Sequence, residues 1–553
     1  MTEKLTKEQK EAQVAREAAT NNILKHKSNK IVVVAGPGTG KTCVFAELFA
    51  SKEGADKLTL TFINALVEDL SLELRGISDV KTLHGYALSR FRKGKVKIFP
   101  GMPEIIRDDG KVLLGEDINF EDKIHEIDET GGHLDFYSVR RKYYDHFGYS
   151  DIILGLVRLF QNKPEAIPSY SQIVVDEFQD FNWLEVTLIE LLATKSHILI
   201  AGDDDQALYD FKKADPKYIR KLHGDDRPDY TSLPLPFCSR STKVVVDSVN
   251  DIVSEATKQG FLTRRVPKSY EYFSCPEKDK ESTDEPQLIH KRLEDGQIAW
   301  FIAEEMDKIA SEKKKKFEVL VISPYIAQCE KIGRALVGKG FTAVKYKTSE
   351  EAEISYIDGL RMLTNCRVGH KSNLGWRIAS HFKLSAEAFA DVLKASTVED
   401  PLPFRRMVPG DIRKVIERDA LLLKKIGDKQ PVDAANLNTL LDSLSLDQDQ
   451  IKMDYLRQKL LRGRRASPGY PGIKKNPITG TTIQSSKGLS AEYVFITHFD
   501  QRYLPGKYGI TDQSICKLLV ALTRARKKVW LISTTDHSSV FLSFIDKSRI
   551  KCE

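Results

Sequence analysis

Residues 31–42 read Ile31-Val-Val-Val-Ala-Gly-Pro-Gly-Thr-Gly-Lys-Thr42, and a helix-like pattern continues to Phe49. The β-branched run predicts a buried strand, and the glycines that follow predict a tight turn that opens a helix. In this strand–turn–helix order, backbone N–H groups and the helix N-terminus converge on phosphate oxygens. The stretch therefore predicts an α/β domain that holds the phosphates of a nucleoside triphosphate.

This predicted phosphate loop also supplies a cation and a metal ligand. In such loops the lysine, here Lys41, reaches the β- and γ-phosphates, and the hydroxyl that follows, here Thr42, ligates magnesium. The first loop position is Ala35, where the strict pattern has Gly. The residues expected to bind the nucleotide are Ala35, Gly36, Pro37, Gly38, Thr39, Gly40, Lys41 and Thr42.

Other short apolar runs predict further strands, and together they favour an α/β fold with two parallel sheets. The runs in the first half are 58–62, 173–175 and 197–200, and those in the second half are 317–322, 493–496 and 529–532. Helical patterns such as Ser385–Leu393 and Asp411–Lys425 lie between strands of the second half, and we interpret that region as an insertion. The polar segment 275–290 is expected to be a loop.

Two acidic residues end one of these strands. In Val174-Val-Asp-Glu-Phe-Gln-Asp180, Asp176 can hold magnesium, directly or through water, and Glu177 can accept a proton from an attacking water. A lone Asp-Glu pair at a strand end is common by chance. With the phosphate loop upstream, it favours hydrolysis over transfer to a substrate hydroxyl.

Three more side chains suit a γ-phosphate. Gln206 follows the strand at 197–200, and its amide can sense the phosphate or its attacking water. Arg240 and Arg524 carry permanent charges with forked donors, which match the developing charge of the transition state. If both arginines belong to the second sheet, they reach the nucleotide only when the two sheets close on it. For each arginine in isolation, a surface cation is the alternative.

Composition sets broad limits. The chain has 553 residues, and Lys plus Arg (85) exceed Asp plus Glu (78) by +7, which permits an anionic partner without requiring one. Seven cysteines form no C-x-x-C pair, which is typical of thiols in a reducing compartment. The charged N-terminus and the lack of a run of about 18 apolar residues argue against a signal peptide or membrane span. A cytoplasmic protein is expected, nucleoid-associated if bacterial.

The ordered motifs resemble those of the UvrD/Rep/PcrA family of superfamily 1 helicases. They comprise the phosphate loop at 35–42, the acidic motif at 176–180, Gly202-Asp-Asp-Asp-Gln-Ala-Leu-Tyr-Asp-Phe211, Thr482-Ile-Gln-Ser-Ser-Lys-Gly-Leu489 and Val520-Ala-Leu-Thr-Arg-Ala525. The resemblance implies two RecA-like P-loop domains, each with a mostly helical insertion, ATP with magnesium between them, and single-stranded DNA across their tops. It assigns Lys41, Thr42, Asp176, Glu177, Gln206, Arg240 and Arg524 to the hydrolytic site.

The resemblance also implies residues that contact the base and the DNA. Gln9, in a motif that resembles the family's adenine-reading segment, is the candidate that distinguishes adenine. The residues implied to face DNA are Phe62, Asn64, Thr82, His84, Tyr209, Phe211, Thr482 and Lys487. Aromatic rings suit this role because every base has a π-face. Ordinary core packing is the alternative for the three aromatics, and a satisfied core histidine is the alternative for His84.

The same resemblance predicts a domain order. Residues 1–88 and 166–235 form the first RecA-like core, with an accessory insertion at 89–165. Residues 236–350 and 473–553 form the second core, with a helical insertion at 351–472.

Two functions from different classes remain open. The first is an ATP-dependent helicase or translocase on single-stranded DNA, 3′ to 5′ by resemblance. The second is a DNA-gated ATPase module that acts with a partner such as a nuclease, as in bacterial anti-phage defence, and unwinds poorly alone. Ser239 motivates it, because relatives carry an adenine-stacking Tyr there, and so does an insertion that is short for this family. RNA in place of DNA is a further alternative.

Overall fold

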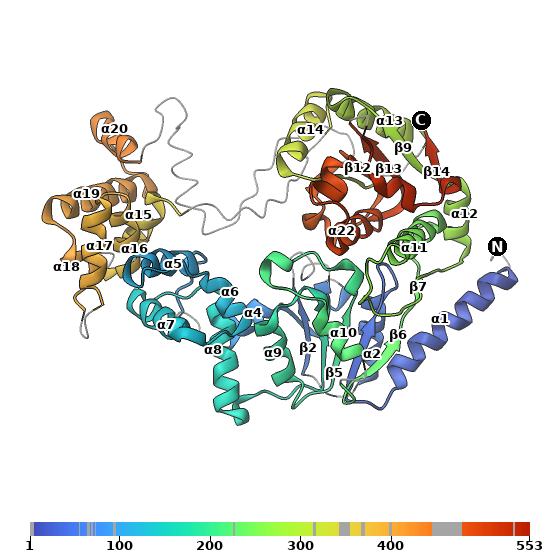
Figure 1. Cartoon of the computed structure of the whole chain (residues 1–553), viewed down its shortest axis with the longest axis horizontal. Coiled ribbons are helices and arrows are strands. Elements are labelled where there is room, and N and C mark those ends of the chain that lie inside the picture. The colour runs from blue at the N-terminus through green and yellow to red at the C-terminus, as the bar shows by residue number, and fades with distance from the viewer. Residues whose placement is uncertain are drawn as a thin grey trace. The chain divides into compact units, whose positions relative to one another are not determined.

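A computed structural model provides the structure of this chain (Figure 1). It describes residues 5–52, 54, 56–62, 67, 70, 71, 73–91, 96–224, 227–312, 317–341, 354–365, 371–397, 401–444, 478–534 and 537–553. The side chains of Phe211 and Asn365 are outside this description. The chain divides into two compact units, the first comprising Met1–Tyr86, Val157–Ser349 and Gly469–Glu553, and the second comprising Ala87–Leu156 and Glu350–Pro468.

The first sheet of unit 1 is six-stranded and parallel. Its spatial order is β3 (Asp79–Thr82), β2 (Lys57–Thr61), β4 (Gln172–Val175), β5 (Ile198–Gly202), β1 (Lys30–Val34) and β6 (Thr231–Pro234). The register pairs Val32 with Ile200 on β5 and with Ser232 on β6. Because β4, β5 and β1 are neighbours, the three sequence motifs that follow them lie at one edge of the sheet.

The second sheet of unit 1 repeats this architecture. Its order is β11 (Ile478–Thr482), β10 (Val319–Ser323), β12 (Ala491–Thr497), β13 (Ala525–Ser533), β9 (Leu288–Arg292) and β14 (Ile550–Cys552), all parallel. A separate parallel pair joins β7 (Phe237–Cys238) to β8 (Glu271–Tyr272). Strands β9, β12 and β13 can be followed side by side in Figure 1.

Helices cover these sheets and bury their apolar runs. One core cluster packs α1 and α2 onto the first sheet, and two others pack α11 with α22, and α13 with α14, onto the second. The helices of unit 1 are α1 (Lys7–Lys25), α2 (Lys41–Ser51), α9 (Trp183–Leu192), α10 (Lys217–His223), α11 (Lys243–Lys258), α12 (Pro276–Asp284), α13 (Ile298–Glu312), α14 (Ile326–Gly338) and α22 (Asp512–Leu522).

Unit 2 is helical, and it joins two segments that are far apart in the sequence. Its helices are α5 (Met102–Leu113), α6 (Phe120–Glu126), α7 (His133–Tyr144), α15 (Tyr356–Asn365), α16 (Asn373–His381), α17 (Ala386–Ala395), α18 (Phe404–Met407), α19 (Gly410–Gly427) and α20 (Ala434–Ser443). Two further helices, α4 (Leu83–Arg90) and α8 (Tyr149–Asn162), contain residues of both units.

A buried ion network connects the two segments of unit 2. The fully buried carboxylate of Asp109 accepts from Arg140 Nη2 at 2.8 Å and from Arg377 Nη2 at 3.0 Å. Both arginines are buried as well. Since buried charges require partners, this network ties the segment 87–156 to the segment 350–468.

The expected fold class, α/β with two RecA-like parallel sheets and helical insertions, is confirmed. The expectation of a loop at 275–290 is wrong, because this segment contains α12 and the start of β9. Its polar composition reflects a solvent-facing helix: none of the α12 side chains is buried. The six-segment domain boundaries stay a prediction.

Candidate active site

The predicted phosphate loop connects β1 to α2, as the sequence pattern requires. Gly38 and Gly40 have φ of +73° and +86°, a region that favours glycine. Lys41 Nζ donates to the backbone oxygens of Ala35 at 3.1 Å and Gly36 at 3.3 Å. The ammonium therefore lies over the loop itself, next to the N-terminus of α2.

Residues of the second half of unit 1 contact this loop directly. A Cβ at Gly36 would lie 2.5 Å from the ring of Tyr270, whose hydroxyl donates to Pro37 O at 3.0 Å. A Cβ at Gly38 would lie 2.4 Å from Cβ of Arg240. The backbone N–H of Ser239 donates to Gly38 O at 3.0 Å. Only glycine at positions 36 and 38 permits Tyr270 and Arg240 to lie this close to the loop. The loop is therefore shaped for the packing of these two side chains as well as for a ligand.

The acidic motif ends β4 with two carboxylates of different character. Burial, with help from Glu177, raises the pKa of Asp176 to about 7. Burial would also raise the pKa of Glu177, but the charges of Lys487 and Lys41 outweigh it and lower this pKa. Glu177 is thus held ionised, which is the form that accepts a proton. Its backbone has φ of +55°, which turns the side chain away from the regular strand direction.

Lys487 completes this acidic group from the second half of unit 1. Its side chain is fully buried, with Nζ 2.6 Å from Asp180 Oδ2 and 3.6 Å from Glu177 Oε2. The ammonium also donates to Gln206 O at 2.6 Å. Lys487 is predicted to face DNA; in this structure its ammonium contacts the acidic motif, and contact with DNA stays a prediction.

Gln206 connects the two halves of unit 1. Its Nε2 donates to Asp203 Oδ2 at 2.6 Å, and its Oε1 accepts from Arg524 Nη2 at 3.0 Å. Burial and the nearby charge of Arg240 lower the pKa of Arg524 to about 10. Two of the three residues predicted to act on a γ-phosphate therefore contact one another: Gln206 follows the first sheet, and Arg524 directly precedes β13 of the second.

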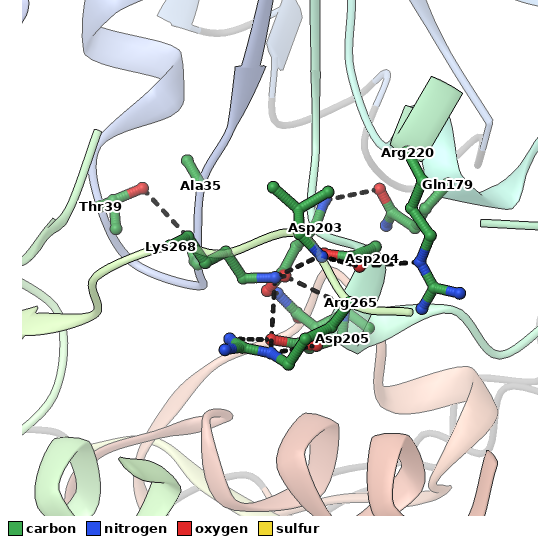
Figure 2. Close-up of polar contacts among 12 residues, drawn as sticks. Ala35, Thr39, Gln179, Asp203, Asp204, Asp205, Arg220, Arg265 and Lys268 are labelled. Atoms are coloured by element: carbon green, nitrogen blue, oxygen red, sulfur yellow. Dashed lines mark hydrogen bonds and ion pairs between the residues drawn. The ribbon is translucent and has the colours of Figure 1, made fainter. Parts of the chain in front are cut away.

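A cluster of three aspartates precedes Gln206 in the sequence, and Figure 2 shows it together with Lys268 and Arg265. Asp203, Asp204 and Asp205 are buried at the end of β5, with carboxylate oxygens within 4.8 Å of one another. Lys268 Nζ lies 2.8, 2.6 and 2.8 Å from these three carboxylates in turn. Arg265 also pairs with Asp205, at 2.7 Å. The charges of the cluster are thus neutralised largely by one loop, residues 259–270, that precedes β8.

Both amide atoms of Gln9 have a hydrogen-bond partner in this structure. Its Oε1 accepts from the backbone N–H of Thr6, and its Nε2 donates to Asp279 Oδ2 at 2.7 Å. Asp279 also accepts from Tyr272 Oη and Ser274 Oγ. Adenine reading by Gln9 stays a prediction.

Two of the predicted DNA-facing aromatics lie together. The ring of Phe62 is 4.9 Å from that of Tyr209 and 5.7 Å from that of the buried Phe181. Tyr209 Oη donates to Gln484 O at 3.3 Å, which links it to the second half of unit 1. Phe62 and Tyr209 are both half-buried, and stacking of bases on their rings stays a prediction.

Three other predicted DNA-facing residues lie at strand ends or in α4. Thr82 Oγ1 accepts from Gly85 N at the start of α4, and Thr482 Oγ1 accepts from Ser485 N. His84 Nδ1 lies 3.9 Å from Glu185 Oε1. Asn64 and the side chain of Phe211 lie outside the described residues. Contact of any of these residues with DNA stays a prediction.

Several residues of the site were missed by sequence reasoning. Asp180 and Asp203 lie within the motifs at 174–180 and 202–211. Their acidic side chains in these motifs could have identified them as site residues. Tyr270 and Lys268 carried no such signal, because nothing in their local pattern relates them to residues 36 or 203–205. Their role depends on the tertiary fold alone.

Comparison with known proteins finds similarity to helicase sequences. Residues 116–226 match the family model described as UvrD/REP helicase N-terminal domain. The ATP-dependent DNA helicase PcrA of Staphylococcus aureus (strain Mu50) is 31% identical over 142 residues, 24% of this chain and 19% of PcrA. The probable DNA helicase II homolog of Mycoplasma capricolum is 22% identical over 456 residues, 72% of this chain and 61% of that protein.

The resemblance to UvrD and PcrA is confirmed. The alignments of this UvrD-like chain span 19% of PcrA and 61% of the helicase II homolog, which is less than two thirds of either relative. Among the described residues of the UvrD-like chain, no helix combines the length and apolar character needed to cross a bilayer.

Proposed function

We propose that this UvrD-like chain is an ATP-dependent helicase or translocase that moves on single-stranded DNA, 3′ to 5′. In this proposal the two sheets of unit 1 close on ATP, and hydrolysis releases them. The direction and the closure rest on the resemblance. The substrate rests on what the relatives' names state, namely ATP-dependent action on DNA.

The contact between Gln206 and Arg524 carries the proposal. It joins a residue at the end of β5 to a residue at the start of β13 through a 3.0 Å hydrogen bond. A phosphate bound by the Lys41 loop would compete for the same guanidinium, because phosphate oxygens are stronger acceptors than a neutral amide. A bound phosphate would therefore weaken a hydrogen bond that joins the first sheet of unit 1 to the second.

The side chains present fit a magnesium nucleotide. Asp176 is a buried carboxylate, and burial raises its pKa, so a divalent cation would stabilise its ionised form. Asp176 and the Thr42 hydroxyl would hold the ion, which when bound neutralises charge on the phosphates. Lys41 would bind phosphate oxygens, Arg240 and Arg524 would stabilise charge on the γ-phosphate, and Glu177 would accept a proton from the attacking water.

ATPase assays with and without nucleic acid test this function. We expect single-stranded DNA to stimulate hydrolysis strongly, and Lys41→Ala to abolish it. Matched DNA and RNA oligomers distinguish the two possible tracks. Hydrolysis that is indifferent to every nucleic acid would contradict the proposal. Binding of DNA should weaken as salt rises, because phosphate contacts release counterions.

A second candidate is a DNA-gated ATPase module that acts with a partner such as a nuclease. The engagement of Gln9 by Asp279 favours it, since a base-reading residue held in this way suits a protein that awaits a further signal. Strand displacement on duplexes with a 3′ or a 5′ tail separates the two candidates. Robust unwinding by the chain alone, on 3′ tails only, supports the helicase with the stated polarity and excludes the module.

A further inference from the structure

Lys268 occupies the centre of the Asp203–Asp205 cluster from another part of the chain. Figure 2 shows its side chain directed into the three carboxylates. The Lys268 side chain is only 8% exposed, and the carboxylates hold its pKa above the usual value although burial opposes this. A buried charged lysine with three partners is costly to remove, since its loss leaves three neighbouring anions with fewer counter-charges.

The geometry connects Lys268 to Gln206 through the two oxygens of a single carboxylate. Asp203 Oδ1 lies 2.8 Å from Lys268 Nζ, and Asp203 Oδ2 accepts from Gln206 Nε2 at 2.6 Å. A carboxylate can only accept, so the amide of Gln206 must present its N–H₂ group to Asp203. Its oxygen is then directed at the donor Arg524 Nη2.

We propose that Lys268 is a positioning residue for ATP hydrolysis, which acts through Asp203 to orient the amide of Gln206 toward Arg524. This inference rests on the proposed function and adds a residue outside the sequence motifs. Without the ammonium, Asp203 repels Asp204 and Asp205, and its Oδ1 loses its shorter contact, which leaves the 3.2 Å hydrogen bond from the backbone N–H of Asp205. The amide of Gln206 can then rotate, which misplaces it at the γ-phosphate.

The same loop supplies a matched control. Arg265 also crosses to the cluster, where its guanidinium binds Asp205 through Nε and Nη2. Its hydrogen bonds reach Asp205 and do not include Asp203. Replacing Arg265 therefore weakens the attachment of the loop without removing the group that holds Asp203.

The test measures kcat and KM for ATP with saturating single-stranded DNA. We expect Lys268→Met to lower kcat by about 10- to 100-fold, the range for a misplaced catalytic group, with KM changed by less than about threefold. Arg265→Gln should lower the midpoint of thermal unfolding but change kcat by less than about twofold. Equal effects of the two variants on kcat would overturn the proposal.

A double-mutant cycle separates positioning from general stabilisation. If Lys268 acts through Gln206, Lys268→Met should lower kcat by less than about twofold in a Gln206→Ala background, because the group it orients is absent. Multiplicative losses would overturn the proposal. If Lys268→Met does not fold, Lys268→Arg provides the same comparison, since a guanidinium cannot place one nitrogen against three carboxylates.

The outcomes also separate this inference from the proposed function. A wild-type chain that hydrolyses ATP with DNA stimulation, together with a Lys268→Met variant of unchanged kcat, contradicts the inference and leaves the function intact. A wild-type chain that does not hydrolyse ATP contradicts both.

Discussion

Glu177 is the side chain whose chemistry can be tested most directly. It is held ionised by Lys487 and Lys41, and Gln179 Nε2 donates to its Oε2 at 2.6 Å. We expect Glu177→Gln to lower kcat for ATP by about 10²- to 10⁴-fold, because an amide cannot accept the proton of the attacking water. Steady-state ATPase assays measure this loss, and nucleotide binding should persist.

The control for Glu177→Gln is the same substitution at Glu47, an exposed residue of α2 in the same sheet domain. Glu47→Gln should leave kcat unchanged. A Glu177→Gln variant with near wild-type kcat would show that another group accepts the proton.

The raised pKa of the buried Asp151 predicts how the stability of unit 2 depends on pH. Burial raises the pKa of Asp151 in α8 from 3.8 to about 6, although Gly148 N and Tyr137 Oη donate to its carboxylate. A carboxyl pKa that is higher in the folded state contributes stability below the unfolded pKa, and this contribution is lost as pH rises through about 6. We expect unit 2 to unfold at lower urea concentration at about pH 8 than at about pH 5.

Asp151→Asn should flatten this pH dependence, because an amide does not titrate. Asp135→Asn, at an exposed position of α7, should keep the wild-type slope. An unchanged slope in Asp151→Asn would assign the pH dependence to other groups.

At the scale of elements, the phosphate loop and the chain that covers it are packed for glycine. Gly38 combines a φ of +73° with the approach of Arg240 Cβ to 2.4 Å of any added Cβ. We expect Gly38→Ala to destabilise unit 1 by more than the backbone strain of about 1–3 kcal/mol, because backbone and side chain must both shift. Thermal unfolding monitored by fluorescence measures this effect.

Gly340 offers the matched element-scale control. It has a φ of +87°, and nothing lies within 4 Å of an added Cβ. Gly340→Ala therefore carries the backbone strain alone. If the two variants lose equal stability, the loop does not depend on close contact with Arg240.

At the scale of the whole molecule, the ion network around Asp109 joins the two segments of unit 2, which lie far apart in the sequence. The network predicts that the two segments unfold together. We expect Asp109→Ala to destabilise unit 2 by about 3–5 kcal/mol, because the buried Arg140 would lose its carboxylate partner and the buried Arg377 would keep only the more distant Asp108, at 3.9 Å. Hydrogen exchange should then increase in both 96–156 and 371–444. Asp117→Ala breaks an exposed pair with Arg107 and should change exchange little. Faster exchange in one segment only would contradict the coupling.

Much of this molecule was predictable from local pattern. The runs at 31–34, 173–175 and 197–200 are strands because buried parallel strands are continuously apolar, and their carboxyl ends deliver Lys41, Asp176 and Gln206 to one edge. The short strands β3 and β6 were not predicted, since their burial is partial and no apolar run marks them. The polar helix α12 was predicted as a loop for a similar reason: a helix with no buried side chain has no apolar stripe.

The sequence by itself determined the fold class, the phosphate loop and the candidate catalytic pair, because these depend on residues that are neighbours along the chain. Only the tertiary structure decided that Lys268 neutralises Asp203–Asp205, that Tyr270 covers the phosphate loop and that Asp109 joins two insertions. Each of these contacts links residues more than 60 positions apart. Contacts at that separation are set by how helices and strands pack, and no local periodicity in the sequence predicts them.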